Sequence, residues 1–358
     1  MVANNWRLPW RLILLGSLVM AAFLWSGCFP SHNQSTFDPA GPVARDQLTL
    51  FKIIFWMAAF VFVVVEGALV VAIFRFRRKP GEHALPKQLH GNTSLEVTLT
   101  ILSAVVLAVI AVPTVTTIFA QANPPPGDRV EIKVVGHQWW WEFNYPQYGI
   151  TTANELRVPV GKPIVLEMTS QDVIHSFWIP KLAGKIDVIP TRTNQLWFQA
   201  DKAGLYYGQC AELCGTAHAQ MRFQVIAQSQ VDFDQWVADQ NRPPAVAMIP
   251  EFGIKGCVVC HTVNGPEAPE TQARRMDSFR QGLPQFPGPN LTHFASRNTF
   301  AAGLVDRTDE TLRKWVEDPN VIKPGNRMKE LAGAYHVSGQ FLSEADITTL
   351  VGYLQSLK

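Results

Sequence analysis

The sequence predicts a multidomain chain with two membrane-spanning helices, then an all-β domain, then an all-α domain. Two apolar runs, about 50–74 and 97–119, are each long enough to cross a hydrocarbon core as a helix. Between 130 and 226, short and partly alternating runs are separated by Gly or Pro turns, as in a sandwich or barrel. From 251 onward amphipathic helical spacing appears, at 308–316 and 343–357. The 358 residues suffice for two or three such units.

The N-terminus has the order of a secretory signal. Arg7 and Arg11 precede an apolar run at 12–24, and Ser26-Gly27-Cys28 follows it. We expect 1–27 to be a signal peptide and Cys28 to become the lipidated N-terminus of a lipoprotein, which adds anchorage to the helices. The alternative is an ordinary signal, cleaved or uncleaved, with an unmodified Cys28.

The two apolar runs form an expected hairpin, 48–120, joined by a basic loop. Five cations in that loop face only one acid, Glu82: Arg75, Arg77, Arg78, Lys79 and Lys87. The positive-inside rule therefore predicts a cytoplasmic loop and an exported domain after 119. A buried helical pair in a soluble protein is the alternative, which the length and apolarity of the runs oppose.

Two acids lie in or beside the membrane runs: Glu66 within the first and Glu96 at the cytoplasmic start of the second. An intramembrane acid is costly and normally faces a partner or a proton route. We therefore expect another membrane subunit. The formal net charge of +2, with no basic stripe, gives no reason to expect nucleic-acid binding.

The five cysteines divide into one plus two close pairs, which favours metal or haem attachment over a disulfide framework. Around the first pair, Cys210, Cys214 and His218 are each four residues apart, Met221 follows three later, and His175 lies upstream. Thiolate, imidazole and thioether together favour copper. A mononuclear blue-copper site needs one cysteine, and two thiolates bridging two copper ions explain the second. Each copper then gains one histidine, with the thioether a weak ligand to one and a backbone carbonyl, that of Glu212, to the other.

Two alternatives to copper remain for this cluster. A Cys210–Cys214 disulfide would leave both histidines and the methionine unexplained, and zinc seldom uses methionine.

Cys257-Val-Val-Cys260-His261 is the attachment signature of c-type haem, in which both thiols bond the haem and the histidine binds iron. A thioredoxin-type redox pair is the alternative, opposed by the histidine and the helical surroundings. Lys323-Pro-Gly-Asn-Arg-Met328 resembles the loop of class I cytochromes c that supplies the axial methionine, which makes Met328 the second iron ligand. A Met/His pair raises the haem potential. The competing ligands are Met276, His293 and His336.

Over about 48–226 the chain resembles subunit II of haem–copper oxidases, which carries the binuclear CuA site. A polar stretch at 229–250, with Pro243 and Pro244, predicts a short helix and a linker before a cytochrome c domain at 251–358. The resemblance implies a cupredoxin-like Greek-key CuA domain at 128–228. It implies these CuA ligands: His175, Cys210, Glu212 through its carbonyl, Cys214, His218 and Met221. Presence of the ligands argues against quinol as the donor, because quinol-oxidising relatives have lost them.

The resemblance also implies three roles outside the copper ligands. The Glu212 carboxylate would help bind magnesium at the interface with subunit I, since a carboxylate suits a hard cation. In Gly136-His-Gln-Trp-Trp-Trp-Glu-Phe143, Trp139 would be the electron-entry residue, the alternative being that all three tryptophans only pack. Glu96 would lie at the mouth of a proton channel, the alternative being an interfacial acid without a role.

The expected function follows from these sites together. Electrons would pass from an external donor, cytochrome c or another periplasmic carrier, through haem c, Trp139 and CuA to subunit I, where oxygen is reduced to water with proton pumping. The tether raises the effective concentration of the haem donor beside copper. The expected setting is a bacterial inner membrane, with subunits I and III as partners and both cofactor domains outside. The alternatives are a subunit of a CuA-containing nitric oxide reductase and a free membrane-bound carrier, which the hairpin argues against.

Overall fold

The structure is a computed structural model that describes residues 15–20, 32–78, 81, 88, 90–263, 265 and 288–358. Most of the expected signal peptide and Cys28 lie outside the described residues, as do Lys79, Glu82, Lys87 and Met276.

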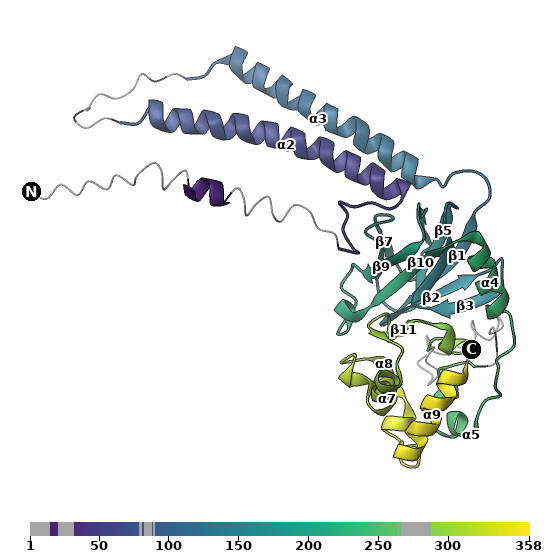
Figure 1. The fold of residues 1–358 in the computed structure, drawn as a ribbon. Helices are drawn as coiled ribbons and strands as arrows, with labels where there is room; N and C mark the ends of the chain where they lie inside the picture. The colour runs from purple at the N-terminus through teal and green to yellow at the C-terminus, as the bar shows by residue number, and fades with distance from the viewer. Residues whose placement is uncertain are drawn as a thin grey trace, which may run out of the picture.

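Two long helices, α2 (Pro42–Arg75) and α3 (Thr93–Ala122), form a hairpin that projects away from the rest of the chain (Figure 1). Both are long and apolar enough to cross a membrane, and the apolar side chains along them are exposed. A helix satisfies its own backbone hydrogen bonds, which a lipid environment requires. At the base of the hairpin, Gln121 accepts a 3.1 Å bond from Gln47 and its carbonyl accepts a 3.0 Å bond from the Trp197 indole. The hairpin is therefore tied to the β domain.

The β domain is a sandwich of two five-stranded sheets. One sheet has the order β3 (Ile150–Ala153), β2 (Trp140–Tyr145), β1 (Val130–His137), β5 (Ile164–Ser170), β8 (Asn194–Phe198). The other has the order β4 (Glu155–Pro159), β10 (Arg222–Gln228), β9 (Gly204–Cys210), β6 (His175–Trp178), β7 (Lys185–Val188). The pairs β1–β5 and β4–β10 are parallel and the remaining pairs antiparallel. The predicted cupredoxin-like all-β domain is confirmed.

An aromatic cluster fills the space between the sheets. Phe177 and Phe223 stack at 4.2 Å between ring centroids, and Trp141 meets both edge-on. All three side chains are fully buried. Such rings contribute both area and specific geometry, so the strand ends that carry the polar site rest on a rigid base.

The segment expected as a short helix and a linker, 229–250, begins with a helix, α4 (Gln230–Gln240), capped by Ser229. Phe233 and Trp236 of α4 are buried in the β-domain core, where Trp236 packs edge-on against Tyr145 at 5.2 Å. The helix therefore belongs to the β domain, and the connection to the next domain is shorter than the predicted linker.

The C-terminal domain is helical and lies at the end of the sandwich away from the hairpin (Figure 1). Its elements are α5 (Pro250–Ile254), η2 (Cys257–Val259), η3 (Phe294–Ser296), β11 (Thr299–Phe300), β12 (Val305–Asp306), α7 (Asp309–Glu317), η4 (Pro319–Val321), α8 (Arg327–Leu331), η5 (Gly333–Tyr335) and α9 (Glu344–Ser356). Both predicted helices are present, and capping boxes begin them at Thr308 and Ser343. Tyr353 packs in the core of this domain against Phe252.

Candidate copper and haem centres

The structure brings the predicted copper ligands together at one end of the second sheet. Cys210 is the last residue of β9, and His175 the first residue of the neighbouring strand β6. Cys214 lies in the loop after β9, His218 begins η1, and Met221 directly precedes β10. The backbone pairing of β6 with β9 is what carries His175 to the cysteines from 35 residues upstream.

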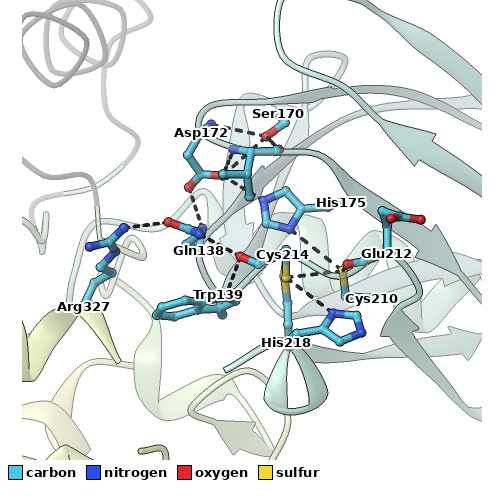
Figure 2. A network of polar contacts seen from close by, with 12 residues as sticks. Gln138, Trp139, Ser170, Asp172, His175, Cys210, Glu212, Cys214, His218 and Arg327 are labelled. Atoms are coloured by element: carbon cyan, nitrogen blue, oxygen red, sulfur yellow. Dashed lines mark hydrogen bonds and ion pairs between the residues drawn. The ribbon is translucent and has the colours of Figure 1, made fainter. Parts of the chain in front are cut away.

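The sulfur atoms lie at the centre of this group (Figure 2). The two cysteine Sγ atoms are 3.7 Å apart, much longer than the ~2.05 Å of a disulfide bond. His175 Nδ1 lies 3.9 Å from Cys210 Sγ, and His218 Nδ1 lies 3.5 Å from Cys214 Sγ. Met221 Sδ is 3.9 Å from Cys214 Sγ, and the Glu212 carbonyl oxygen is 3.3 Å from Cys210 Sγ. Every donor expected from the sequence therefore faces the thiol pair.

The thiol pair has unequal acidity. The hydrogen bond between the two sulfur atoms lowers the pKa of the Cys210 thiol and raises that of Cys214, and burial opposes ionisation of both. The pair therefore holds one negative charge readily, and a second requires bound cations. Two soft thiolates with two imidazoles and a thioether fit copper ions, so this donor set agrees with a binuclear copper centre.

Asp172 orients His175, a role that the sequence reasoning missed. Its Oδ1 accepts a 2.8 Å bond from His175 Nε2, which leaves Nδ1 toward the thiols, and its Oδ2 accepts a 2.6 Å bond from the Gln138 backbone (Figure 2). Burial raises the pKa of Asp172, but the hydrogen bond and charge of His175 outweigh it and hold the pKa below the usual value. The sequence signal was an acid three residues before the ligand.

The other predicted residues near copper are placed differently. The Glu212 side chain is exposed and turns away from the thiols (Figure 2), so its carbonyl and carboxylate face different surroundings. Glu96 lies in the first turn of α3, where its carboxylate accepts a 3.3 Å bond from the Asn92 backbone. The structure does not bring Glu96 near either cofactor site.

The haem-attachment residues line one cavity in the C-terminal domain. Its lining contains Cys257, Cys260, His261 and Met328 with many apolar side chains. Burial raises the pKa of the Cys257 thiol to about 11. Two cysteines, an imidazole and a thioether among apolar side chains are the groups that a covalently attached haem requires.

The loop after 287 orients the imidazole of His261. His261 Nδ1 donates a 2.8 Å bond to the Pro289 carbonyl, which leaves Nε2 for a metal. A Cβ at Gly288 would lie 2.6 Å from this ring, so only glycine permits the contact. Among the described candidates for the second iron ligand, Met328 lines this cavity, and His293 and His336 do not. His336 instead bonds the Lys329 carbonyl.

The β domain completes the wall of the haem cavity. Gln138, Trp139 and Trp140 line it together with Arg327. Trp139 is only 6% exposed, and its indole Nε1 donates a 3.1 Å bond to the carbonyl of Cys214. Gln138 donates a 2.7 Å bond to the same carbonyl and accepts one of 2.7 Å from Arg327, whose guanidinium lies 5.6 Å from the Trp139 ring centroid (Figure 2). Gln138 and Trp139 therefore contact both the haem cavity and the loop that carries Cys214.

The three adjacent tryptophans have three different surroundings. Trp141 is fully buried in the β-domain core, whereas Trp140 stacks on His137 at 4.1 Å and touches Ala302 of the C-terminal domain. Of these three tryptophans, Trp139 alone both lines the haem cavity and hydrogen-bonds the carbonyl of Cys214, a predicted copper ligand.

Three family models match the chain. The transmembrane domain of cytochrome c oxidase subunit II matches 30–117, its periplasmic domain matches 149–229, and cytochrome c matches 252–358. Cytochrome c oxidase subunit 2 of Alkalihalophilus pseudofirmus is 37% identical over 99% of this chain and 98% of its own length. The same subunit of Bacillus sp. strain PS3 is 37% identical over 99% of both chains. The crystal structure of the periplasmic domain of cytochrome oxidase subunit II from Bradyrhizobium japonicum is 38% identical, covering 32% of this chain and 94% of that one, with a TM-score of 0.31.

Proposed function

The chain belongs to the cytochrome c oxidase subunit II family, and on this premise we propose that it is the electron-entry subunit of an oxidase carrying its own cytochrome c. Electrons from an external carrier would pass through haem c and CuA to a haem–copper centre in subunit I, where oxygen is reduced to water with proton pumping. The supporting observation is the Trp139 loop, which lines the haem cavity and hydrogen-bonds the Cys214 carbonyl.

In the proposed copper site the chain supplies a rigid set of donors. Cys210 and Cys214 would bridge two coppers, with His175 and His218 as terminal ligands and Met221 and the Glu212 carbonyl as weak ones. When bound, the copper pair and the haem each store one electron reversibly. Donors fixed on strand ends move little on a change of charge, which lowers the reorganisation that accompanies transfer.

In the proposed haem site, Cys257 and Cys260 would form the thioether bonds, and His261 and Met328 the axial bonds. The hydrogen bond from His261 to the Pro289 carbonyl holds the ring in one tautomer and orientation. A histidine–methionine pair raises the potential, which suits a donor to copper.

The membrane part supports a proposal about orientation and partners. Arg75, Arg77 and Arg78 at the end of α2 favour a cytoplasmic loop, so both cofactor domains would face outward from a bacterial inner membrane. Glu96 at the start of α3 would then lie at the mouth of a proton channel shared with subunit I. Subunits I and III would cover the apolar helices, Glu212 would help bind magnesium at that boundary, and lipid on Cys28 would add anchorage.

Electron paramagnetic resonance of the oxidised full chain, matured with haem c and loaded with copper, tests the copper proposal. One electron shared by two equivalent coppers gives more hyperfine lines than a single copper nucleus can. A mononuclear pattern or no copper signal would refute the bridged pair. Purification with the native partners then tests the reaction, because oxygen consumption supports an oxidase and consumption of nitric oxide alone would identify a nitric oxide reductase.

A further inference from the structure

A buried acid of the β domain contacts the haem domain. Glu155, the first residue of β4, is 3% exposed. Its Oε1 accepts bonds from the backbone N–H groups of Asn298 and Thr299, both 2.7 Å, and from the Thr299 hydroxyl at 3.1 Å. Its Oε2 lies 3.7 Å from the Arg157 guanidinium. All three hydrogen-bond donors to Glu155 therefore belong to the other domain.

The residue before these donors extends the contact to the iron-binding histidine. Arg297 is buried, and its guanidinium donates to the carbonyl of Asn290. Asn290 directly follows Pro289, whose carbonyl accepts the hydrogen bond from His261. A continuous path of bonds thus runs from the β-domain carboxylate to the loop that orients the imidazole.

The same hairpin makes an apolar contact beside Glu155. β11 and β12 pair antiparallel, and the turn between them has positive φ at Ala301, Ala302 and Gly303. This turn carries Ala302 into a small buried cluster with Trp140 and Ala153.

On the Met328 side of the haem cavity, a second polar contact joins the domains. Arg327 bonds Gln138, and the Lys323 ammonium bonds the Trp139 carbonyl. Contacts from both axial-ligand loops therefore meet the β domain around Trp139 and Trp140.

We propose that Glu155 is a positioning residue for electron transfer, which holds the haem domain in one docked pose against the Trp139 face of the copper domain. The inference rests on the proposed function. A buried carboxylate is unfavourable without partners, and here its hydrogen bonds all cross the domain boundary. Hydrogen bonds to an ionised acceptor are stronger than neutral ones. Because tunnelling falls steeply with distance, a fixed pose transfers electrons without the search that a flexible tether imposes.

The test uses the full chain in its purified complex, with variants Glu155→Ala and Glu155→Gln. Glu167→Gln, an exposed acid on β5, is the matched control. Hydrogen exchange of the 296–300 backbone reports the contact without reference to electron transfer. Haem-to-copper transfer is followed after flash reduction of the haem, in buffers of low and high viscosity, with the haem spectrum and copper resonance as checks on both sites.

Glu155→Ala should accelerate exchange at Asn298 and Thr299 and slow transfer about tenfold, the order expected when a reacting geometry shifts by less than about an ångström. The slowed transfer should depend on viscosity, because the domains must then find the pose by diffusion. Glu155→Gln keeps one acceptor oxygen and should recover much of both losses. The inference would be overturned if Glu155→Ala and Glu167→Gln had the same hydrogen-exchange rates at Asn298 and Thr299 and the same rate of haem-to-copper transfer, independent of viscosity. Absence of haem-to-copper transfer in the unmutated complex would overturn the proposed function as well.

Discussion

Replacing Asp172 by asparagine should weaken copper binding without removing any copper ligand. Both oxygens of Asp172 accept: Oδ1 from His175 Nε2 and the Val173 backbone, Oδ2 from the Gln138 backbone. Asparagine offers one oxygen, so in either amide orientation its NH₂ group faces a buried donor. The bound state needs the Nδ1 lone pair on copper and the proton on Nε2. A neutral amide holds that Nε2 proton less strongly than the Asp172 carboxylate does, so the bound state loses more than the empty site.

The magnitude follows from the exchange of a charged partner of a metal-binding histidine for a neutral one. Such a change typically lowers metal affinity roughly 10- to 100-fold. The Kd for copper should therefore rise by the same factor, and each factor of ten corresponds to about 1.4 kcal/mol.

The assay is competition between the protein and a copper chelator, followed by the thiolate-to-copper absorption. Asp187→Asn, the same chemical change at an exposed position of β7, is the control and should leave the Kd unchanged. A Kd for Asp172→Asn within a factor of two of the control would refute the idea that this carboxylate fixes the histidine tautomer.

Three further predictions concern the haem and its contacts. Trp139→Phe keeps a ring but removes the hydrogen bond to Cys214, and should slow haem-to-copper transfer about tenfold in flash-reduction experiments, with both cofactors bound. Met328→Ala should abolish the sulfur-to-iron absorption band and lower the haem midpoint potential, whereas His336→Ala, outside the cavity lining, should change neither. Hydrogen bonds from Ser343 and Lys255 lower the pKa of Asp346 to about 2. The ionised acid therefore stabilises the haem domain above pH ~4, and this stabilisation is lost as pH falls through about 2. Acid unfolding titrations of Asp346→Asn should lack that loss.

Much of this molecule follows from local sequence alone. Helix α7 begins at Thr308 because a threonine there can cap the first turn, and the same reasoning places α9 after Ser343. The spacing of Cys210, Cys214 and His218 confines three donors to one short loop in any fold. The attachment motif at Cys257 is likewise contiguous, so its chemistry is readable without coordinates.

The linker prediction shows where local reasoning ends. The polar segment 229–250, with its two prolines, predicts a short helix and a linker but gives no partner for the helix. Phe233 and Trp236 pack against apolar side chains of the β domain and hold α4 there. Amphipathic spacing identifies a helix, but its partner surface is assembled from strands far away in the chain.

The sequence by itself predicted the candidate ligands and determined the element types and the two long apolar helices, because each depends on residues close together in the chain. Only the tertiary structure decided that Asp172 orients His175, that Met328 rather than His293 or His336 lines the haem cavity, and that Glu155 joins the domains. These contacts depend on strand register and on the packing of one domain on another, to which residues distant in sequence contribute jointly. No single stretch of sequence carries that information.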